Sequence, residues 1–514
     1  MRKTKLSFFN KKNISMFLVL ILLLFISSAT VFAADDILKV RAINGSDITT
    51  MDPAYYLGDE ELNIDLSFYS KLIRFKPGSS EWELDAAEEL EVSDDGKIIE
   101  FKLKEGIKFH HGYGELTTED VKFSFERIAD PENNSPYRND WSTLEEVEII
   151  DEYRGRIILS EAYAPLFTQT LAYNPGSIIS KAAYQDRGSN FGTNPVGSGP
   201  YYWENWDPGE KITLLRFEDY YDELPDFRRI EIFPISEVRM AEIALDAGEL
   251  NSTQISYDSF DIYNQAADIK VDQVAVTRQV YLGFNMQEEP FTDINVRKAI
   301  RYAVDVDEVI LGAYNNIAQR ARSSIVKGVL GHWEDAPQYD PDLEKAREYL
   351  AKAGYEDGFK TELVVPVREP LPEAGQIIRQ QLLAIGIDAK IQMTDSSFDY
   401  LSQSRSNMHL QDWGPTHDPD RWTKWWHSDH IGSWNFKNFS NPEYDCLVEE
   451  AVLELDQEKR HQLYVEQQKI LDEEVTAVWI SHGAHLHASR EYIKPVFLTQ
   501  RSQYRYWEIV EQTK

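Results

Sequence analysis

Cysteine is almost absent from this chain, and its scarcity excludes several ways of stabilising and anchoring a protein. Cys446 is the only cysteine among 514 residues, so no disulfide can form within the chain. The fold must therefore depend on the size of its hydrophobic core. No cysteine stands directly after the apolar segment at the N-terminus, so the usual site of lipid attachment is missing as well. We expect Cys446 to be a small buried residue of a helix.

Basic side chains are also scarce. The chain carries 53 Lys and Arg against 87 Asp and Glu, which gives a formal net charge of −34 at pH 7. A surface of that sign repels nucleic acid and anionic membranes, so we expect no nucleic-acid partner. The acids are scattered rather than grouped in blocks, as expected for a solvated surface. The 42% share of hydrophobic residues excludes a disordered chain.

Motifs of catalysis and metal binding are missing too. The sequence has no Gly-rich phosphate loop ending in Gly-Lys-Ser/Thr, no His-Glu-x-x-His pair and no Gly-x-Ser-x-Gly elbow. The spacing of His409, His417, His427 and His430 matches no compact zinc site. We therefore expect neither an enzyme nor a metal or cofactor. A secreted hydrolase is a remote alternative, because such enzymes share the abundance of tryptophan and carboxylates.

The sequence has only one long apolar run, Met16 to Phe32. Basic residues precede it, and Val31-Phe32-Ala33 ends it with a small-residue cleavage site, which predicts a signal peptide over 1–33 and a periplasmic or extracellular location. The run is near the lower length limit of a spanning helix. An uncleaved membrane anchor is therefore the alternative.

The rest of the chain is too long for one compact core, so at least two lobes are expected. Its first region is rich in strands. Residues 98–103 alternate between apolar and polar after the turn Asp94-Asp95-Gly96, which predicts a hairpin. Thr117 is then expected to cap a helix whose apolar residues share one face. The adjacent His110 and His111 are expected at a hairpin.

From about residue 280 the pattern changes to helices that alternate with short strands. A strand at 363–367, a helix at 376–385 and a strand at 389–393 form a β-α-β unit, which favours a parallel sheet. A further strand is expected at 477–481.

Several helix starts in this second region are marked by capping residues. Asp293 is expected to cap one helix, and Asp340-Pro341 to open another that ends at Gly354. Two more helices are expected to begin at Asn441-Pro442 and near Asp456.

One short stretch, residues 412–422, reads Asp-Trp-Gly-Pro-Thr-His-Asp-Pro-Asp-Arg-Trp. Its glycine and prolines argue against a regular helix or a central strand, so a loop is expected. A loop rich in indole rings and carboxylates either packs on the edge of a core or lines a binding cleft.

A set of further motifs runs in order along the chain. It comprises Met51-Asp52-Pro53, residues 105–124, Asn194 to Tyr201 (NPVGSGPY), Phe284-Asn285, Pro290-Phe291, residues 296–300, and Asp456 with Arg460 and Tyr464. This set resembles the family 5 extracellular solute-binding proteins of ABC transporters, which deliver peptides, opines or nickel chelates.

The resemblance implies an α/β fold of the bilobed periplasmic-binding-protein type with an extra subdomain, in which two mixed-sheet lobes are joined by a hinge. The implied division begins with a signal peptide (1–33), a first segment of domain I (34–67) and the extra subdomain (68–190). A second segment of domain I (191–280), domain II (281–482) and a return to domain I (483–514) follow.

The resemblance also implies a function. The protein is expected to enclose a small peptide or peptide-like solute between its lobes by hinge closure, without performing chemistry. It is expected to act as a monomer and to deliver the solute to ABC permease and ATPase subunits. A receptor for nickel or another metal chelate is the alternative within the same family.

Site residues follow from the same resemblance, which places the segment from Trp413 at the cleft with its ring against the ligand. Peptide binders have an aspartate for the ligand's α-amino group where this chain has Thr416. The shortened loop is closer to nickel-chelate binders, which have a tyrosine where this chain has His417. We expect His417 or Asp418 to contact the ligand. Arg368 is similar to the arginine that dipeptide binders use for the ligand's carboxylate, a task that suits the guanidinium fork.

Overall fold

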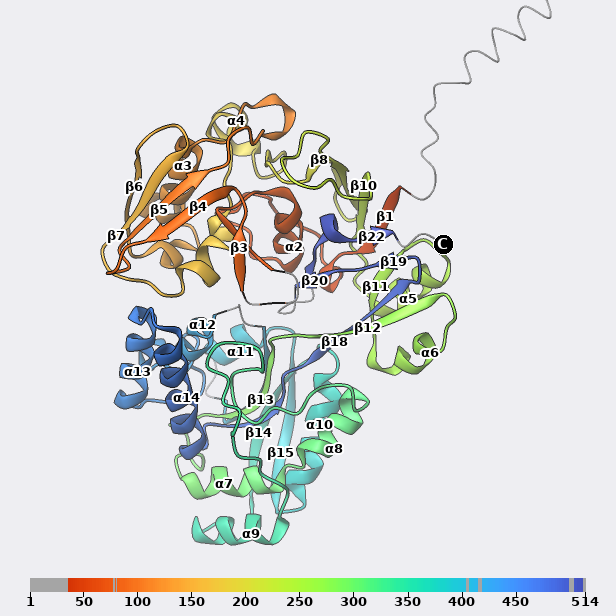
Figure 1. Cartoon of the computed structure of the whole chain (residues 1–514). Helices are drawn as coiled ribbons and strands as arrows, with labels where there is room; N and C mark the ends of the chain where they lie inside the picture. The colour runs from red at the N-terminus through yellow and green to blue at the C-terminus, as the bar shows by residue number, and fades with distance from the viewer. Residues whose placement is uncertain are drawn as a thin grey trace, which may run out of the picture.

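The computed structural model describes residues 36–511 except 77–78, 80, 404–405, 415–417 and 499–502. The predicted signal peptide lies outside these residues. Among them, no helix combines the length and the apolar character needed to cross a membrane. The described chain forms two lobes, each built on a mixed sheet (Figure 1).

Lobe I, at the top of Figure 1, contains a seven-stranded sheet drawn from distant regions of the chain. In spatial order its strands are β12 (Ile269–Ala275), β18 (Ala484–Arg490), β11 (Ser252–Ile255), β1 (Ile37–Arg41), β10 (Arg229–Phe233), β9 (Lys211–Arg216) and β8 (Tyr201–Asp207). β1 pairs in parallel with β10 and β11, while the other pairs are antiparallel. Leu38 and Val40 of β1 are fully buried in the core of this lobe.

A four-stranded antiparallel sheet extends lobe I. Its strands, in order, are β4 (Ala87–Val92), β5 (Ile98–Leu103), β7 (Arg154–Leu159) and β6 (Leu144–Ile149). The expected hairpin joins β4 to β5, and Gly96 supplies the positive φ of +68° that the turn requires. His110 and His111 lie in a short turn flanked by Lys108 and Glu115, which pair antiparallel as in a hairpin.

The helices of lobe I follow local signals. They are α2 (Asp59–Phe68), α3 (Thr118–Ala129), α4 (Lys181–Arg187), α5 (Val238–Asp246) and α6 (Phe260–Asn264). α3 begins as expected, with a capping box between Thr117 and Asp120, and it buries Val121 and Phe125. Short strand pairs complete the lobe: β2 (Ile73–Phe75) with β3 (Trp82–Leu84), β19 (Ile493–Lys494) with β22 (Val510–Glu511), and β20 (Phe497–Leu498) with β21 (Gln503–Tyr504).

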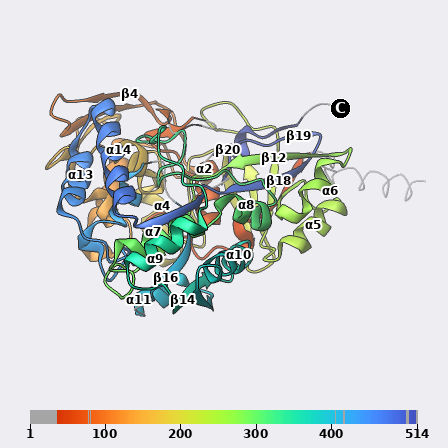
Figure 2. The same cartoon turned by 90° about the horizontal axis from the view of Figure 1, so that it is seen from below.

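Lobe II is built on a five-stranded sheet with the order β15 (Ile387–Thr394), β14 (Phe359–Pro366), β16 (Met408–Trp413), β13 (Gln279–Phe284) and β17 (Ala477–Ser481). The expected β-α-β unit is confirmed, because β14 and β15 are parallel neighbours joined by α10 (Leu371–Leu383). The other helices are α7 (Ile294–Ala303), α8 (Val306–Tyr314), α9 (Leu343–Lys352), α11 (Ser397–Gln403), α12 (Asp420–Lys424), α13 (Pro442–Leu453) and α14 (Gln457–Glu473). Figure 2, a view from below, brings α7, α9 and α10 to the front.

Two neighbouring segments carry the chain between the lobes. Ala275, the last residue of β12, pairs with Ala484 of β18 in the sheet of lobe I. Val280 of β13 pairs with Ser481 of β17 in the sheet of lobe II. The crossing segments, 276–278 and 482–483, therefore run side by side, as a hinge requires.

Two expectations about local structure are wrong. α9 is capped by Asp342, whose carboxylate accepts the N–H of Lys345 at 2.9 Å, rather than opened by Asp340-Pro341. The stretch 412–422 is not a continuous loop. Asp412 and Trp413 end the central strand β16, and α12 begins at Asp420. Proline is tolerated at a helix start because the first amides need no partner there, so Pro419 does not prevent the helix.

Cys446 also differs from expectation. It lies in α13, as predicted, but its side chain is exposed. The buried face of α13 carries Tyr444 and Val448, two residues on either side of it. This spacing turns Cys446 away from the core, since neighbouring positions on a helix face different directions.

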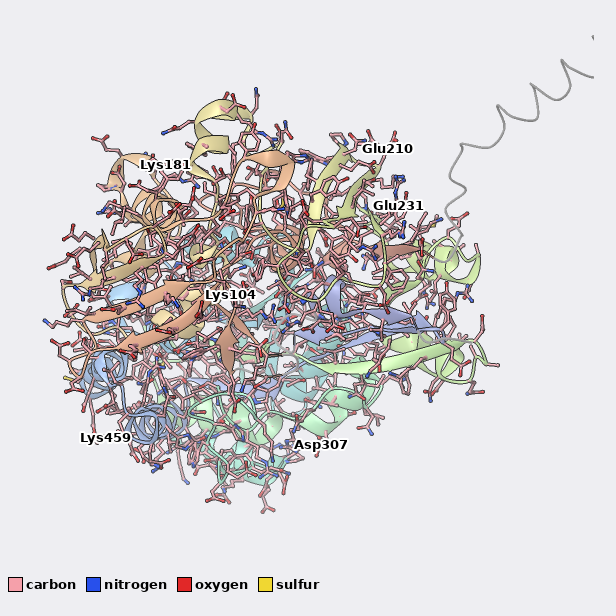
Figure 3. All side chains as sticks on the ribbon, turned by 45° about the horizontal axis from the view of Figure 1, so that its top comes forward. Lys104, Lys181, Glu210, Glu231, Asp307 and Lys459 are labelled. Atoms are coloured by element: carbon pink, nitrogen blue, oxygen red, sulfur yellow. The ribbon has the colours of Figure 1, made fainter. Side chains whose placement is uncertain are left out.

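Charged side chains cover the surface of both lobes, as Figure 3 shows. The labelled residues Lys181, Glu210, Asp307 and Lys459 lie far apart on the molecule. The acidic composition is therefore carried by a surface of mixed sign in contact with solvent.

Candidate functional site

A cavity of about 530 Å³ lies between the two lobes, beside the crossing segments. Lobe I lines it with the end of β1, the start of α5 and the residues after β11. Lobe II lines it with the residues that link β14 to α10 and with the end of β16. Both sheets thus present strand ends to one space. Its charged lining residues are Arg41, Glu237, Arg239, Asp258, Arg278, Arg368, Glu369 and Asp412.

Asp412, at the end of β16, lies between two arginines of this cavity. Its carboxylate accepts a hydrogen bond from Nε of Arg278 at 2.5 Å and another from Nη2 of Arg368 at 2.8 Å. Burial alone would raise the pKa of Asp412, but the two guanidinium groups outweigh it and lower that pKa. Asp412 is therefore an anion that positions two cations.

Arg368, the predicted carboxylate-binding residue, lies at this cavity. Its side chain is 48% exposed, and within the described residues only its Nη2 donates hydrogen bonds, to the carboxylate and the carbonyl of Asp412. Asp412 raises the pKa of Arg368, but Arg278 and burial together lower it more. Nε and Nη1 remain as donors for a further anion.

Trp413 follows Asp412 and packs into an aromatic cluster of lobe II. Its ring centroid lies 5.2 Å from that of Trp425 and 5.3 Å from that of Trp434, and Phe436 is 6.3 Å away. The indole is partly buried rather than enclosed. The cluster fixes the end of β16 beside the cavity.

Asp418 is held by partners within the protein. Its oxygens accept hydrogen bonds from Nη1 and Nη2 of Arg460 at 2.8 and 2.7 Å, in a bidentate pair that is 2% exposed on each side. Burial would raise the pKa of Asp418, but Arg460 lowers it below its ordinary value. The hydroxyl of Thr168, from lobe I, also donates to this carboxylate at 2.7 Å. The structure thus places Asp418 in a contact between the lobes, outside the residues that line the cavity.

Two more contacts join the lobes on the same side. Nη2 of Arg421 in α12 donates to both carboxylate oxygens of Asp140, at 3.1 and 3.2 Å. The backbone N–H of Ala164 donates to the carbonyl of Val452 in α13 at 2.8 Å. We call these two contacts, with Thr168–Asp418, the closure contacts. The lobes are therefore connected both at the crossing segments and along α12 and α13.

The remaining predicted site residues, Thr416 and His417, lie outside the described residues. Among the residues that the structure does describe, no group of three or more His, Cys, Asp or Glu side chains is arranged to hold a metal ion. The cavity offers charges of both signs to a bound molecule.

Sequence reasoning overlooked several residues of the cavity. Arg278 belongs to a crossing segment, and Arg41 ends β1, more than two hundred residues away along the chain. Neither has a local sequence signal, because only the folded sheets bring them together. Asp412 precedes Trp413 in the stretch 412–422, which the sequence analysis considered as a binding loop, but Asp412 itself was not predicted to be a site residue.

Comparisons with known proteins show the family to which the chain belongs. The model of bacterial extracellular solute-binding proteins, family 5 (middle region), matches residues 81–434. The dipeptide-binding protein of Escherichia coli (strain K12) is 29% identical over 468 residues, which cover 83% of this chain and 85% of that protein. The glutathione-binding protein GsiB of Shigella dysenteriae is 30% identical over 372 residues, covering 71% of this chain and 70% of its own.

A solved structure confirms the bilobed fold. The ABC transporter-associated periplasmic binding protein DppA from Helicobacter pylori, in complex with the peptide STSA, has a TM-score of 0.79 and 26% sequence identity, covering 93% of this chain and 98% of its own. The chain belongs to the bacterial extracellular solute-binding proteins of family 5, which are receptors that capture a solute and not enzymes.

Proposed function

We propose that this protein is the receptor of an ABC importer and that it binds a small peptide or peptide-like solute in the cavity between its lobes. The position of Arg368 carries the proposal. Its guanidinium is fixed through Nη2 by Asp412, lies at the cavity and keeps two donor nitrogens for a carboxylate. A fixed guanidinium fork suits the planar carboxylate at the end of a peptide.

The charges of the cavity support the same class of ligand. A peptide carries an ammonium as well as a carboxylate, and Asp258 and Glu369 line the cavity that also contains Arg368. The names of related proteins point the same way, since two relatives are named for binding dipeptides and glutathione. A lining of both signs favours an amphoteric solute over a purely apolar one.

The loop after β16 is proposed to border the ligand. Asp412 brings the end of β16 to the cavity, so the chain leaves the strand at the cavity edge. Trp413, Thr416 and His417 follow directly. Asp418, whose carboxylate binds Arg460, is proposed to act on closure instead.

The proposal also covers the export of the protein, its transporter partners and its domains. Residues 1–33 are proposed to direct export and to be removed, and the monomer is proposed to deliver its solute to ABC permease and ATPase subunits. The proposed domains are 34–67, 68–190 and 191–280 in lobe I, 281–482 in lobe II, and 483–514 back in lobe I. Strand membership in the two large sheets supports this division.

Native mass spectrometry of the purified protein, followed by calorimetry with the peptide it retains, tests the proposal. We expect a ligand of peptide mass, bound with one-to-one stoichiometry and released unchanged. A preparation that binds a nickel chelate but no member of a dipeptide library would favour the metal-chelate alternative. Release of cleaved peptide would contradict a receptor.

A further inference from the structure

Arg41 is a buried cation with no carboxylate partner among the described residues. It is 3% exposed and lines the cavity between the lobes. Nε donates to the carbonyl of Ile235 at 2.6 Å, and Nη2 donates to that of Ser236 at 2.8 Å. Nη1 is buried and has no hydrogen-bond partner there. The hydrogen bonds of this buried guanidinium therefore go only to carbonyl groups, which do not supply the negative charge that would compensate its desolvation.

The acids that interact electrostatically with Arg41 do not compensate its charge fully. Glu237 is exposed to solvent, and burial raises the pKa of Glu60 to about 8, so Glu60 is mainly neutral at pH 7. Its oxygens accept hydrogen bonds from the N–H of Ile43 and from Asn63. Burial also lowers the pKa of Arg41 itself, as expected for a charge removed from solvent.

The start of α5 provides a second, independent observation at the same cavity. Glu237, Val238 and Arg239 line the cavity where this helix of nine residues begins. The N-cap residue is Glu237, but its side chain does not bind the helix amides, and no acid occupies the first turn. Among the described residues, the N–H groups of Val238 and Arg239 have no hydrogen-bond acceptor. Free amides at a positive helix end bind anions.

We propose that Arg41, Arg239 and the N-terminus of α5 form a second anion-binding subsite, so that the solute carries a second acidic group besides the carboxylate at Arg368. This inference rests on the proposed function, and it adds the class of ligand: peptides with an acidic side chain, or compact dicarboxylates. Lobe I holds one anionic group and lobe II holds the other. Such a ligand bridges the lobes and favours the closed form.

Three acids near this subsite do not cancel it. Nη1 of Arg239 donates to the carboxylate of Glu242 at 3.0 Å, which leaves Nε and Nη2 of Arg239 without an acceptor among the described residues. Glu237 and Asp258 line the cavity, but both are exposed, so solvent screens their charges. Arg41 is buried, so its charge acts through a medium of lower dielectric. An anion that displaces water from the cavity therefore interacts more strongly with Arg41 than with the exposed acids.

The test compares ligands that differ in one charge. Calorimetry at fixed ionic strength measures Ala-Glu against Ala-Gln, Glu-Ala against Gln-Ala, and glutarate as a dicarboxylate without a peptide bond. One added charge-assisted contact changes affinity by about tenfold to a hundredfold. We expect the wild-type protein to prefer the glutamate peptide by that factor in at least one order of residues.

Substitutions test which residues cause the preference for the glutamate peptide over the glutamine peptide. Arg239→Gln changes an exposed side chain and is expected to reduce the preference severalfold, while Arg41→Met is expected to abolish it. Arg154→Gln, an exposed substitution on β7, is the matched control and should leave it unchanged. If Arg41→Met does not fold, the proposal is still tested by the affinities of the wild-type protein for the peptide pairs and by the loss of preference in Arg239→Gln.

The outcomes distinguish the anion-binding subsite from the peptide-receptor function. Peptides that bind equally with Glu and Gln, in both orders, overturn the subsite and leave the peptide receptor intact. Glutarate that binds in an Arg239-dependent way while no peptide binds supports the subsite and overturns the peptide receptor. Absence of binding by both peptides and glutarate contradicts both.

Discussion

Asp412 organises the cavity at the level of single residues. One carboxylate accepts from two guanidinium groups, so neither arginine can move without weakening the contact. Because Arg278 and Arg368 carry two positive charges and Asp412 carries one negative charge, the three side chains have a net positive charge that can attract an anionic group of the ligand. The ion pair thus prepares a binding site before any ligand enters, which reduces the cost of ordering side chains on binding.

We expect Arg368→Gln to lower affinity for the retained peptide by about tenfold to a hundredfold, because a charge-assisted hydrogen bond to the ligand is lost. Calorimetry gives the affinity and circular dichroism checks folding. Arg347→Gln, on the exposed side of α9, is the control and should bind as wild type. Unchanged affinity in Arg368→Gln would remove this residue from the site.

Lys437 allows a prediction of pH dependence. It is 1% exposed, its Nζ lies 3.9 Å from the centre of the Trp426 ring, and burial lowers its pKa to about 7. The unfolded chain has a lysine pKa of about 10.4, so between pH 7 and that value it binds a proton that the folded state does not. The contribution of Lys437 to stability therefore rises with pH across this window.

Lys437→Met removes this dependence. We expect the variant to be more stable than wild type at pH 7 by about 1–4 kcal/mol, and the difference to shrink towards pH 10. Urea unfolding at several pH values measures this difference in the free energy of unfolding between Lys437→Met and wild type. Leu382→Met, in the core of lobe II, is a matched control without an ionisable group. A difference that does not vary with pH would contradict the assignment.

At the scale of elements, α12 and α13 determine how firmly the lobes stay together. Arg421 of α12 binds Asp140, and the carbonyl of Val452 in α13 accepts from Ala164. In Figure 1 these elements lie on the left of the molecule, away from β12 and β18, so their contacts resist opening at a distance from the hinge.

We expect Arg421→Gln to speed ligand release by about twofold to fivefold, since a partly exposed ion pair contributes up to about 1 kcal/mol. Stopped-flow displacement measures the release rate. The association rate should change less, because substitutions at a contact usually alter the release rate more than the association rate. Equal release rates in Arg421→Gln and in the Arg347→Gln control would show that this contact does not hold the closed form.

Much of the element pattern could be predicted from sequence because it has local causes. The strand-helix-strand order of β14, α10 and β15 follows from apolar periodicity, and the start of α14 follows from Asp456, which accepts from Glu458 and Lys459. Where two competing signals are adjacent, prediction failed. Asp340-Pro341 imitated a helix start, but Asp342 has the accepting carboxylate.

The site was less predictable, for a different physical reason. Arg368 was found through a family resemblance, whereas Arg41 and Arg278 contribute only because distant strands meet at one cavity. The role of Asp418 in a contact between the lobes could not be predicted from the sequence either, because its partners Thr168 and Arg460 belong to different lobes. Tertiary contacts decide such roles, and periodicity carries no information about them.

At the scale of the whole molecule, two crossing segments and a cavity beside them predict hinge motion. Small-angle scattering should give a smaller radius of gyration with the retained peptide than after its removal. The physical reason is that ligand contacts to both lobes favour the closed arrangement. Identical profiles at saturating ligand and without ligand would contradict closure.

The adjacency of the crossing segments has a consequence for chain continuity. All five strands of the lobe II sheet fall between Gln279 and Ser481, and the two ends of this stretch lie beside each other because β13 pairs with β17. Excising it leaves cut ends at Arg278 and His482, a few residues from Ala275 and Ala484, which pair with each other in the sheet of lobe I. The stretch is therefore a cassette: it can be exchanged with that of a relative, or expressed by itself, without breaking a strand of either large sheet.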